Sequence, residues 1–184
     1  EVKIPREILK TPKAMEQVFA AVHATYAEIK FFDKWWKGKV QDWFSFELVG
    51  SAGRLHFYVR VAEPFRNLVE SAIYAQYPDT EIVEVSEDYI SLLPSVLPNQ
   101  IYDLWGTNFI LAREDAYPIR TYPYFEERVK EQRLDPIAAI TEAISKLKVE
   151  EMIWLQILVR PSGDKWKKEG EKLISKLIGR KEKK

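Results

Sequence analysis

The sequence of 184 residues contains no cysteine at all. This absence excludes a disulfide scaffold, a thiolate zinc site and a cysteine nucleophile, because each of them needs the sulfur atom. Glycine is also scarce, with 7 residues, which leaves little of the backbone that can wrap closely around a ligand. No apolar run approaches the roughly 20 residues that a helix needs to span a bilayer.

The sequence also lacks the motifs of well-known catalytic sites. Neither G-x-x-x-x-G-K-[ST] nor G-x-G-x-x-G occurs, and there is no G-x-S-x-G. The two histidines, His23 and His56, do not form the H-E-x-x-H spacing of a helical zinc site. We therefore expect no catalytic residue, no metal ligand and no cofactor in this chain.

Aromatic residues, by contrast, are abundant, with 6 Trp, 9 Tyr and 9 Phe. This content and a hydrophobic fraction of 46% exclude a disordered chain and are typical of a globular one. The 28 basic and 28 acidic residues give a net charge of zero, which disfavours a dedicated nucleic-acid-binding protein. Nine bases and three acids nevertheless gather in residues 165–184. This basic end can meet phosphate or an anionic membrane, or it can be a solvated helix face that leads into a linker.

Hydrophobic spacing predicts a first half, residues 1–86, with the order αββαβ. Thr11 and Pro12 are typical of a helix start, and a glycine-containing turn between two alternating runs indicates a β-hairpin. The predicted elements are a helix over 11–29, strands over 43–49 and 55–61, a helix over 64–76 and a strand over 80–86.

A proline-containing loop over 87–100 is expected to connect this half to a second one, residues 101–179, with the order βαβα. Its elements are a strand over 104–112, a helix from 135 to 147, a strand over 152–159 and a last helix, whose apolar residues from Trp166 to Ile178 should face the core. The strand over 152–159 is apolar on both faces except for Gln156, so we expect a central, covered strand. Residues 180–184 read as a basic linker.

This order of elements predicts an α+β fold with a mostly antiparallel sheet and with helices packed largely on one side. The closest simple architecture is a ferredoxin-like arrangement of split β-α-β units.

Aromatic and basic residues alternate over 31–43. Lys34, Trp35, Trp36, Lys37 and Lys39 are its central members, with further aromatics on either side. Such a pattern can stack bases and hold phosphates, or it can fill a corner of the core beneath lysine stems. It is also typical of a membrane interface.

A second candidate surface lies in the hairpin. His56, Tyr58 and Arg60 share one strand face, and Gln156 and Arg160 can lie near them. In outline this resembles the sheet of an RNA-recognition domain, although the glycine-aromatic string of that domain is missing. The other interpretation is a half-polar sheet face that another domain covers.

Five strings of the chain carry a resemblance to known proteins: KIPREILKTPKAMEQVFAAVH (3–23), WWKGKVQDWFSFELVGSAGRLHFYVRV (35–61), FRNLVESAIYAQYPDTEIVEV (65–85), YPIRTYPYFEE (117–127) and DPIAAITEAISKLKVEEMIWLQILVRPSGDKWKKEGEKLISKLIG (135–179). Together they resemble the N-terminal, non-ATPase region of predicted type IV secretion and conjugative-transfer ATPases of the coupling-protein class.

In that family a membrane-anchoring segment precedes this region and a P-loop motor domain follows it. The resemblance implies a non-catalytic assembly domain, cut from a longer protein, on the cytoplasmic side at the inner face of the cell membrane. Its implied partners are its own downstream ATPase domain, other subunits of the oligomer, and secretion-channel or membrane-proximal components.

Two other functions stay open at this point. One is a nucleic-acid-binding module that guides DNA to such a motor through residues 30–43 and the basic tail of Arg180, Lys181, Lys183 and Lys184. The other is a small stand-alone enzyme with a carboxylate or histidine pocket.

Overall fold

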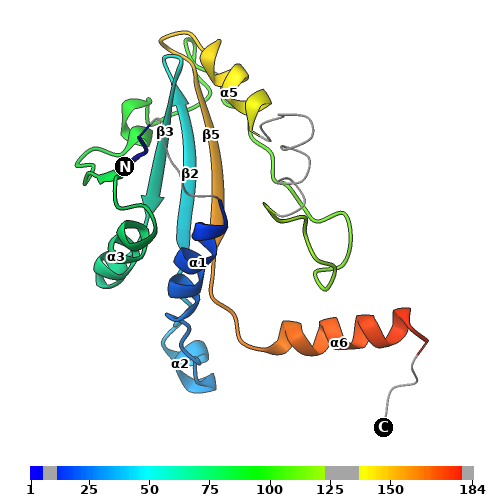
Figure 1. The fold of residues 1–184 in the computed structure, drawn as a ribbon. Helices are drawn as coiled ribbons and strands as arrows, with labels where there is room; N and C mark the ends of the chain where they lie inside the picture. The colour runs from blue at the N-terminus through cyan, green and yellow to red at the C-terminus, as the bar shows by residue number, and fades with distance from the viewer. Residues whose placement is uncertain (6–11, 123–136, 180–184) are drawn as a thin grey trace. The chain divides into compact units, whose positions relative to one another are not determined.

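A computed structural model describes residues 1–5, 12–122 and 137–179 (Figure 1). The chain forms two compact units, which we describe separately. Unit 1 consists of Glu1–Val83 and Ile119–Lys165, and unit 2 consists of Glu84–Pro118 and Trp166–Lys184. These units are divided differently from the predicted halves, because the chain leaves unit 1 at Val83 and returns to it at Ile119.

The described part of unit 1 contains a five-stranded antiparallel sheet with the strand order β4-β1-β3-β2-β5. The strands are β1 (Val2–Lys3), β2 (Phe44–Ser51), β3 (Arg54–Arg60), β4 (Glu81–Ile82) and β5 (Met152–Val159). Because β3 lies between β1 and β2, and β1 lies between β3 and β4, two split β-α-β units interlock as in a ferredoxin-like fold. The predicted α+β class is confirmed, and β1 is a strand that the sequence pattern did not predict.

Three helices of unit 1 cover one face of this sheet. They are α1 (Met15–His23), α3 (Arg66–Gln76) and α5 (Ala138–Ser145). Phe44 of β2 is fully buried, and it belongs to one cluster with valines of α1 and with Val69 and Ile73 of α3. Gly50 lies on the same face of β2, since residues of like parity share a face, and it packs closely against Ile144 of α5. Each buried side chain of this size contributes about 1.5–3 kcal/mol when it leaves water.

A tight turn joins β2 to β3. Ser51 and Arg54 are paired, so the loop consists of Ala52 and Gly53, and both have positive φ angles of 49° and 73°. Two left-handed residues in a two-residue loop match the right-handed twist of the hairpin strands. The predicted hairpin is therefore confirmed.

The predicted helix over 11–29 is too long, because α1 ends at His23. A short 3-10 turn, Pro12–Ala14, precedes α1. After α1, the Thr25 hydroxyl donates to the Val22 carbonyl over 2.7 Å. Threonine side chains that bond a nearby carbonyl in this way compete with helical hydrogen bonding.

The predicted strand over 152–159 is confirmed as β5, but two other expectations about strands are wrong. Residues 104–112 contain no strand, and Trp105, Phe109 and Ile110 are almost fully exposed. A segment of apolar and aromatic residues becomes a strand only where another strand pairs with it, and no described strand does so here. β5 was expected at the centre of the sheet, but it lies at the edge beside β2.

In unit 2, the described elements are a 3-10 helix, Tyr89–Leu92, and the helix α6 (Lys165–Leu177), whose first residue belongs to unit 1. Tyr89 is buried. The apolar residues of the last helix were expected to face the core, but Trp166, Ile174, Leu177 and Ile178 are all more than half exposed. The reason is that the described residues of unit 2 include no sheet that could cover this stripe.

Candidate interaction surfaces

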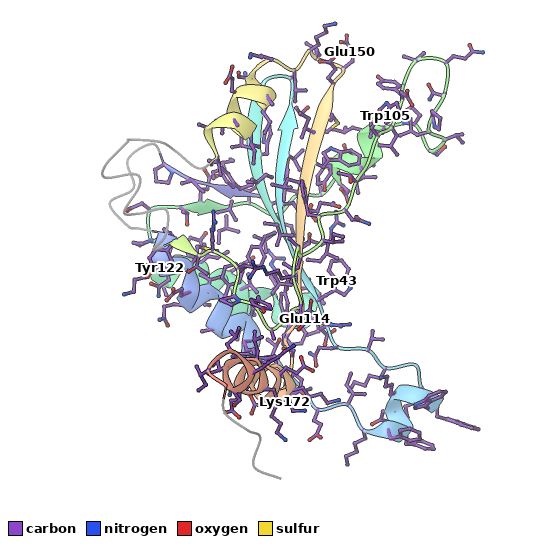
Figure 2. The ribbon with its side chains drawn as sticks, turned by 90° about the vertical axis from the view of Figure 1, so that its right-hand side faces the viewer. Trp43, Trp105, Glu114, Tyr122, Glu150 and Lys172 are labelled. Atoms are coloured by element: carbon purple, nitrogen blue, oxygen red, sulfur yellow. The ribbon has the colours of Figure 1, made fainter. Side chains whose placement is uncertain are left out.

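The helix α2 (Phe31–Trp36) lies on an excursion of the chain between α1 and β2. The backbone N–H of Ala27 donates to the side-chain Oε1 of Gln41 over 3.2 Å, which ties the two ends of this excursion together. In both views of unit 1, α2 lies at the end of the sheet where β2 begins (Figures 1 and 2). We call residues 27–41 the tip.

Local backbone features define α2. Lys30 is extended at the N-cap, with φ −62° and ψ 147°, and its carbonyl accepts from the N–H of Lys34 over 3.0 Å. Asp33 lies in the first turn, where its negative charge interacts favourably with the positive end of the helix dipole. Gly38 has a φ of 62°, which continues no right-handed helix, so α2 stops just before it.

The side chains of α2 divide by type around its axis. At about 100° per residue, the four aromatic residues fall within an arc of about 140°, while Asp33, Lys34 and Lys37 fall on the opposite side. The aromatic rings pair at a spacing of four residues: Phe31 with Trp35 at 5.9 Å between centroids, and Phe32 with Trp36 at 6.1 Å, the latter stacked.

All four aromatic side chains are exposed. The exposed fractions are 77% for Phe31, 62% for Phe32, 74% for Trp35 and 80% for Trp36. The interpretation that these residues fill a corner of the core is therefore wrong. The structure brings the predicted residues Lys34, Trp35, Trp36 and Lys37 onto one short amphipathic helix with no buried residue, and Lys39 follows just after it.

The predicted residues of β3 lie together on the sheet face opposite the helices. The rings of His56 and Tyr58 are stacked with 6.0 Å between their centroids. His56 Nδ1 lies 2.7 Å from the carboxylate of Glu1, and Arg60 Nε lies 3.6 Å from the carboxylate of Glu47.

Glu47 is the residue of this face that sequence reasoning missed. Only 4% of it is exposed, and it is paired directly with Tyr58 on β3 and with Gln156 on β5. The predicted proximity of Gln156 holds, whereas Arg160 lines a cavity beside α1. A buried carboxylate beside Arg60 neutralises the cation, and it repels phosphate, so this face is a poor analogue of an RNA-binding sheet. The only sign of Glu47 in the sequence was that it is a single acidic residue within an alternating strand.

The outer edge of β5 is a further surface. No described strand pairs with this edge, and β5 carries no charged residue along its eight positions. Exposed apolar side chains lie on both of its faces: Ile153 and Ile157 on the helix side, and Leu158 on the other. A long, uncharged, apolar edge is a template for strand pairing with another chain.

Unit 1 has a cavity of about 430 Å³ between α1 and the residues after β5. His23 Nε2 lies 3.1 Å from the Ser162 carbonyl oxygen, so this nitrogen donates and is committed to a structural bond. Glu16 and Arg160 add one charge of each sign. The lining also contains the Ser162 hydroxyl, but the Nε2 atom of His23 is bonded to the Ser162 backbone carbonyl, so this geometry gives no catalytic assignment.

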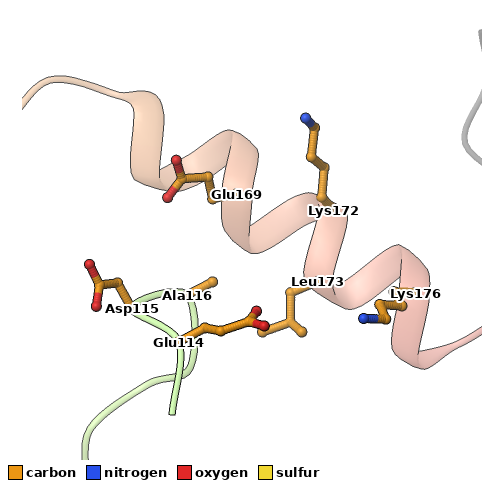
Figure 3. A pocket seen from close by; sticks show the side chains of 7 residues that line it. All are labelled: Glu114, Asp115, Ala116, Glu169, Lys172, Leu173 and Lys176. Carbon is orange, nitrogen blue, oxygen red and sulfur yellow. The ribbon is translucent and has the colours of Figure 1, made fainter. Parts of the chain in front are cut away.

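Unit 2 has an open cavity of about 640 Å³ between residues 114–116 and α6 (Figure 3). Three carboxylates and two lysines line it, together with Ala116 and Leu173. Figure 3 shows that Lys172 points its ammonium group away from the 114–116 loop. Within the described ranges, no group of three histidine, cysteine or acidic side chains is placed to hold a metal ion.

The predicted basic tail of Arg180, Lys181, Lys183 and Lys184 lies outside the described residues. None of the helices that the structure describes is long and apolar enough to cross a membrane.

Together these features define an α+β domain of ferredoxin-like topology with exposed apolar surfaces. A family model described as "Domain of unknown function (DUF8128)" matches residues 1–183, and the chain belongs to this family. No curated protein and no solved structure matches the chain.

Proposed function

We propose that this chain is a non-catalytic assembly and docking domain of a membrane-associated type IV secretion or conjugative-transfer ATPase, on the cytoplasmic side of the membrane. The observation that carries the docking role is the exposed aromatic face of α2. Four large rings in water cost free energy that a partner surface would recover, and a contiguous apolar patch of this kind typically marks an interaction site. The assignment to a type IV secretion or conjugative-transfer ATPase rests on the resemblance of the quoted strings to that family.

Two further observations support assembly over catalysis. The uncharged edge of β5 offers hydrogen bonds for a strand of another subunit. In the two cavities described above, the one imidazole is that of His23, and its Nε2 is bonded to a backbone carbonyl. The domain would thus organise the motor as an oligomer, while ATP is hydrolysed in a domain downstream.

A cross-linking experiment tests this proposal. A photoreactive phenylalanine analogue replaces Trp36 in the parent protein, and the adducts formed in the source cell are identified by mass spectrometry. The same analogue at Trp105, which is 89% exposed in unit 2, is the control (Figure 2). We expect adducts from position 36 with secretion-channel components, motor subunits or lipid. Adducts with nucleic acid alone would overturn the docking role, and ATP turnover by the purified chain would overturn the non-catalytic one.

A second candidate function, a module that guides DNA to the motor, is favoured by one specific observation. The stacked pair of Phe32 and Trp36 is flanked by lysines, and aromatic stacking with nearby cations is how proteins hold single strands. Such binding should fall steeply as salt is raised, because it releases counterions. Absence of binding to single- or double-stranded DNA at low salt would exclude it.

A further inference from the structure

We infer that α2 is an interfacial anchor whose aromatic face enters the headgroup region of an anionic lipid bilayer. This inference rests on the proposed docking role of α2 and names the partner of that surface. It follows from three features of the tip: how the rings are arranged, where the lysines lie, and how the tip is attached to unit 1.

The arrangement of the rings fits a planar interface better than a groove. The four aromatic side chains share one side of the helix within an arc of about 140°. They are Phe31, Phe32, Trp35 and Trp36, and together they form a broad face. Tryptophan is enriched at the boundary between headgroups and acyl chains, and phenylalanine is common on the buried face of helices that lie in this boundary. A helix of six residues is about 9 Å long, so it can lie in that boundary but cannot cross the bilayer.

The charges complement an anionic surface. With the aromatic face directed into the lipid, Lys34 and Lys37 lie on the opposite, polar side, and Lys30 and Lys39 flank the helix at its two ends. Lysine stems reach back to the headgroup level from such positions. Asp33 offsets only one of the four cations, through its ion pair with Lys37 at 2.9 Å.

The attachment of the tip allows the rings to meet a flat surface without disturbing the core. The bond between Ala27 and Gln41 closes the base of the excursion, and the core of unit 1 contains none of the α2 side chains. A protein partner would need a groove matched to four rings, and a nucleic acid would need cations on the same side as the rings. The lysines of α2 lie on the other side, which favours the bilayer over both.

A vesicle-binding experiment tests the inference. The chain is sedimented with vesicles of phosphatidylcholine alone and with vesicles that also contain phosphatidylglycerol. We expect binding to the mixed vesicles and a loss of about tenfold in partitioning for each of Trp35→Ala and Trp36→Ala. The control Trp105→Ala removes an exposed tryptophan outside the tip and should bind as the native chain does. Reversing the charge at Lys34 and Lys39 should abolish the preference for the mixed vesicles.

Two results would overturn the inference. One is equal vesicle binding by the native chain and by the Trp35→Ala/Trp36→Ala variant, with unchanged thermal unfolding as proof that the variant is folded. The other is binding to single-stranded DNA that depends on the same tryptophans without any vesicle binding. If vesicles are not bound while position 36 still cross-links to a secretion or motor protein, the inference fails and the proposed docking role survives.

Discussion

Gly50→Ala tests how closely α5 packs on the sheet. A Cβ at Gly50 would lie 2.6 Å from Cγ1 and 2.9 Å from Cγ2 of Ile144, and 3.1 Å from Cδ1 of Leu147. Ordinary separations between non-bonded carbon atoms are about 3.5–4.0 Å. Ile144 is only 2% exposed, so its side chain has no open space into which it can turn. The added methyl group must therefore push α5 away from β2.

The magnitude follows from two opposing terms. Overpacking a tight core site costs about 1–3 kcal/mol, while replacing glycine by alanine restricts the unfolded chain and returns about 0.4–1 kcal/mol. We expect a net destabilisation of about 1–2 kcal/mol by chemical denaturation. Gly106→Ala is the control, because nothing lies within 4 Å of a Cβ at Gly106, and its effect should stay below about 0.5 kcal/mol.

A double-mutant cycle identifies the cause. Ile144→Ala removes both of the atoms closest to the new methyl group, so Gly50→Ala should cost far less in that background than in the native chain. Strictly additive effects of the two substitutions, or a Gly50→Ala variant as stable as the native chain, would refute the packing of α5 on β2.

Three further substitutions give independent tests. Ala52→Asn should stabilise the hairpin by about 0.5–1 kcal/mol, because asparagine tolerates the positive φ of this position better than alanine does; unchanged or lower stability in urea would contradict the turn geometry. Burial raises the pKa of Tyr77, against a smaller lowering by a backbone hydrogen bond with Met15, so the native chain should lose stability as the pH rises above 10.0. The Tyr77→Phe variant should lose less stability over the same pH range. Identical dependence of stability on pH in the variant and the native chain would exclude this linkage. Leu158→Lys places a charge at the β5 edge and should lower self-association in sedimentation velocity, whereas an unchanged association constant would exclude pairing through this edge.

The sequence predicted the centre of the fold because that region has the clearest periodicity. Strict alternation and a glycine-containing turn specified β2 and β3, and an apolar stripe at helical spacing located α1 and α3. The position of β5 could not be predicted from periodicity. A strand that is apolar on both faces can lie at the centre of a sheet, or it can lie at an edge where another chain pairs with it. The segment 104–112 shows the same limit, because apolar and aromatic residues do not by themselves supply a pairing partner.

The candidate surfaces were predicted in part. The aromatic and basic residues around Trp35 and Trp36 stood out by composition, but a helix of six residues is too short for periodicity to reveal. The sequence therefore left open whether these residues are exposed, and it did not predict their separation into two faces. Glu47 was missed because burial of a single carboxylate depends on residues that other strands bring to it.

A transfer assay in the source cell tests the docking function most directly. Under the proposed function, the gene that encodes this chain carries Trp35→Ala/Trp36→Ala, or Trp105→Ala as the control, and the transfer of DNA or protein substrate is measured together with the cellular level of the encoded protein. We predict that transfer collapses in the α2 variant and is kept in the control, at equal protein levels. Native transfer by the α2 variant would contradict the assignment of this helix as the docking surface.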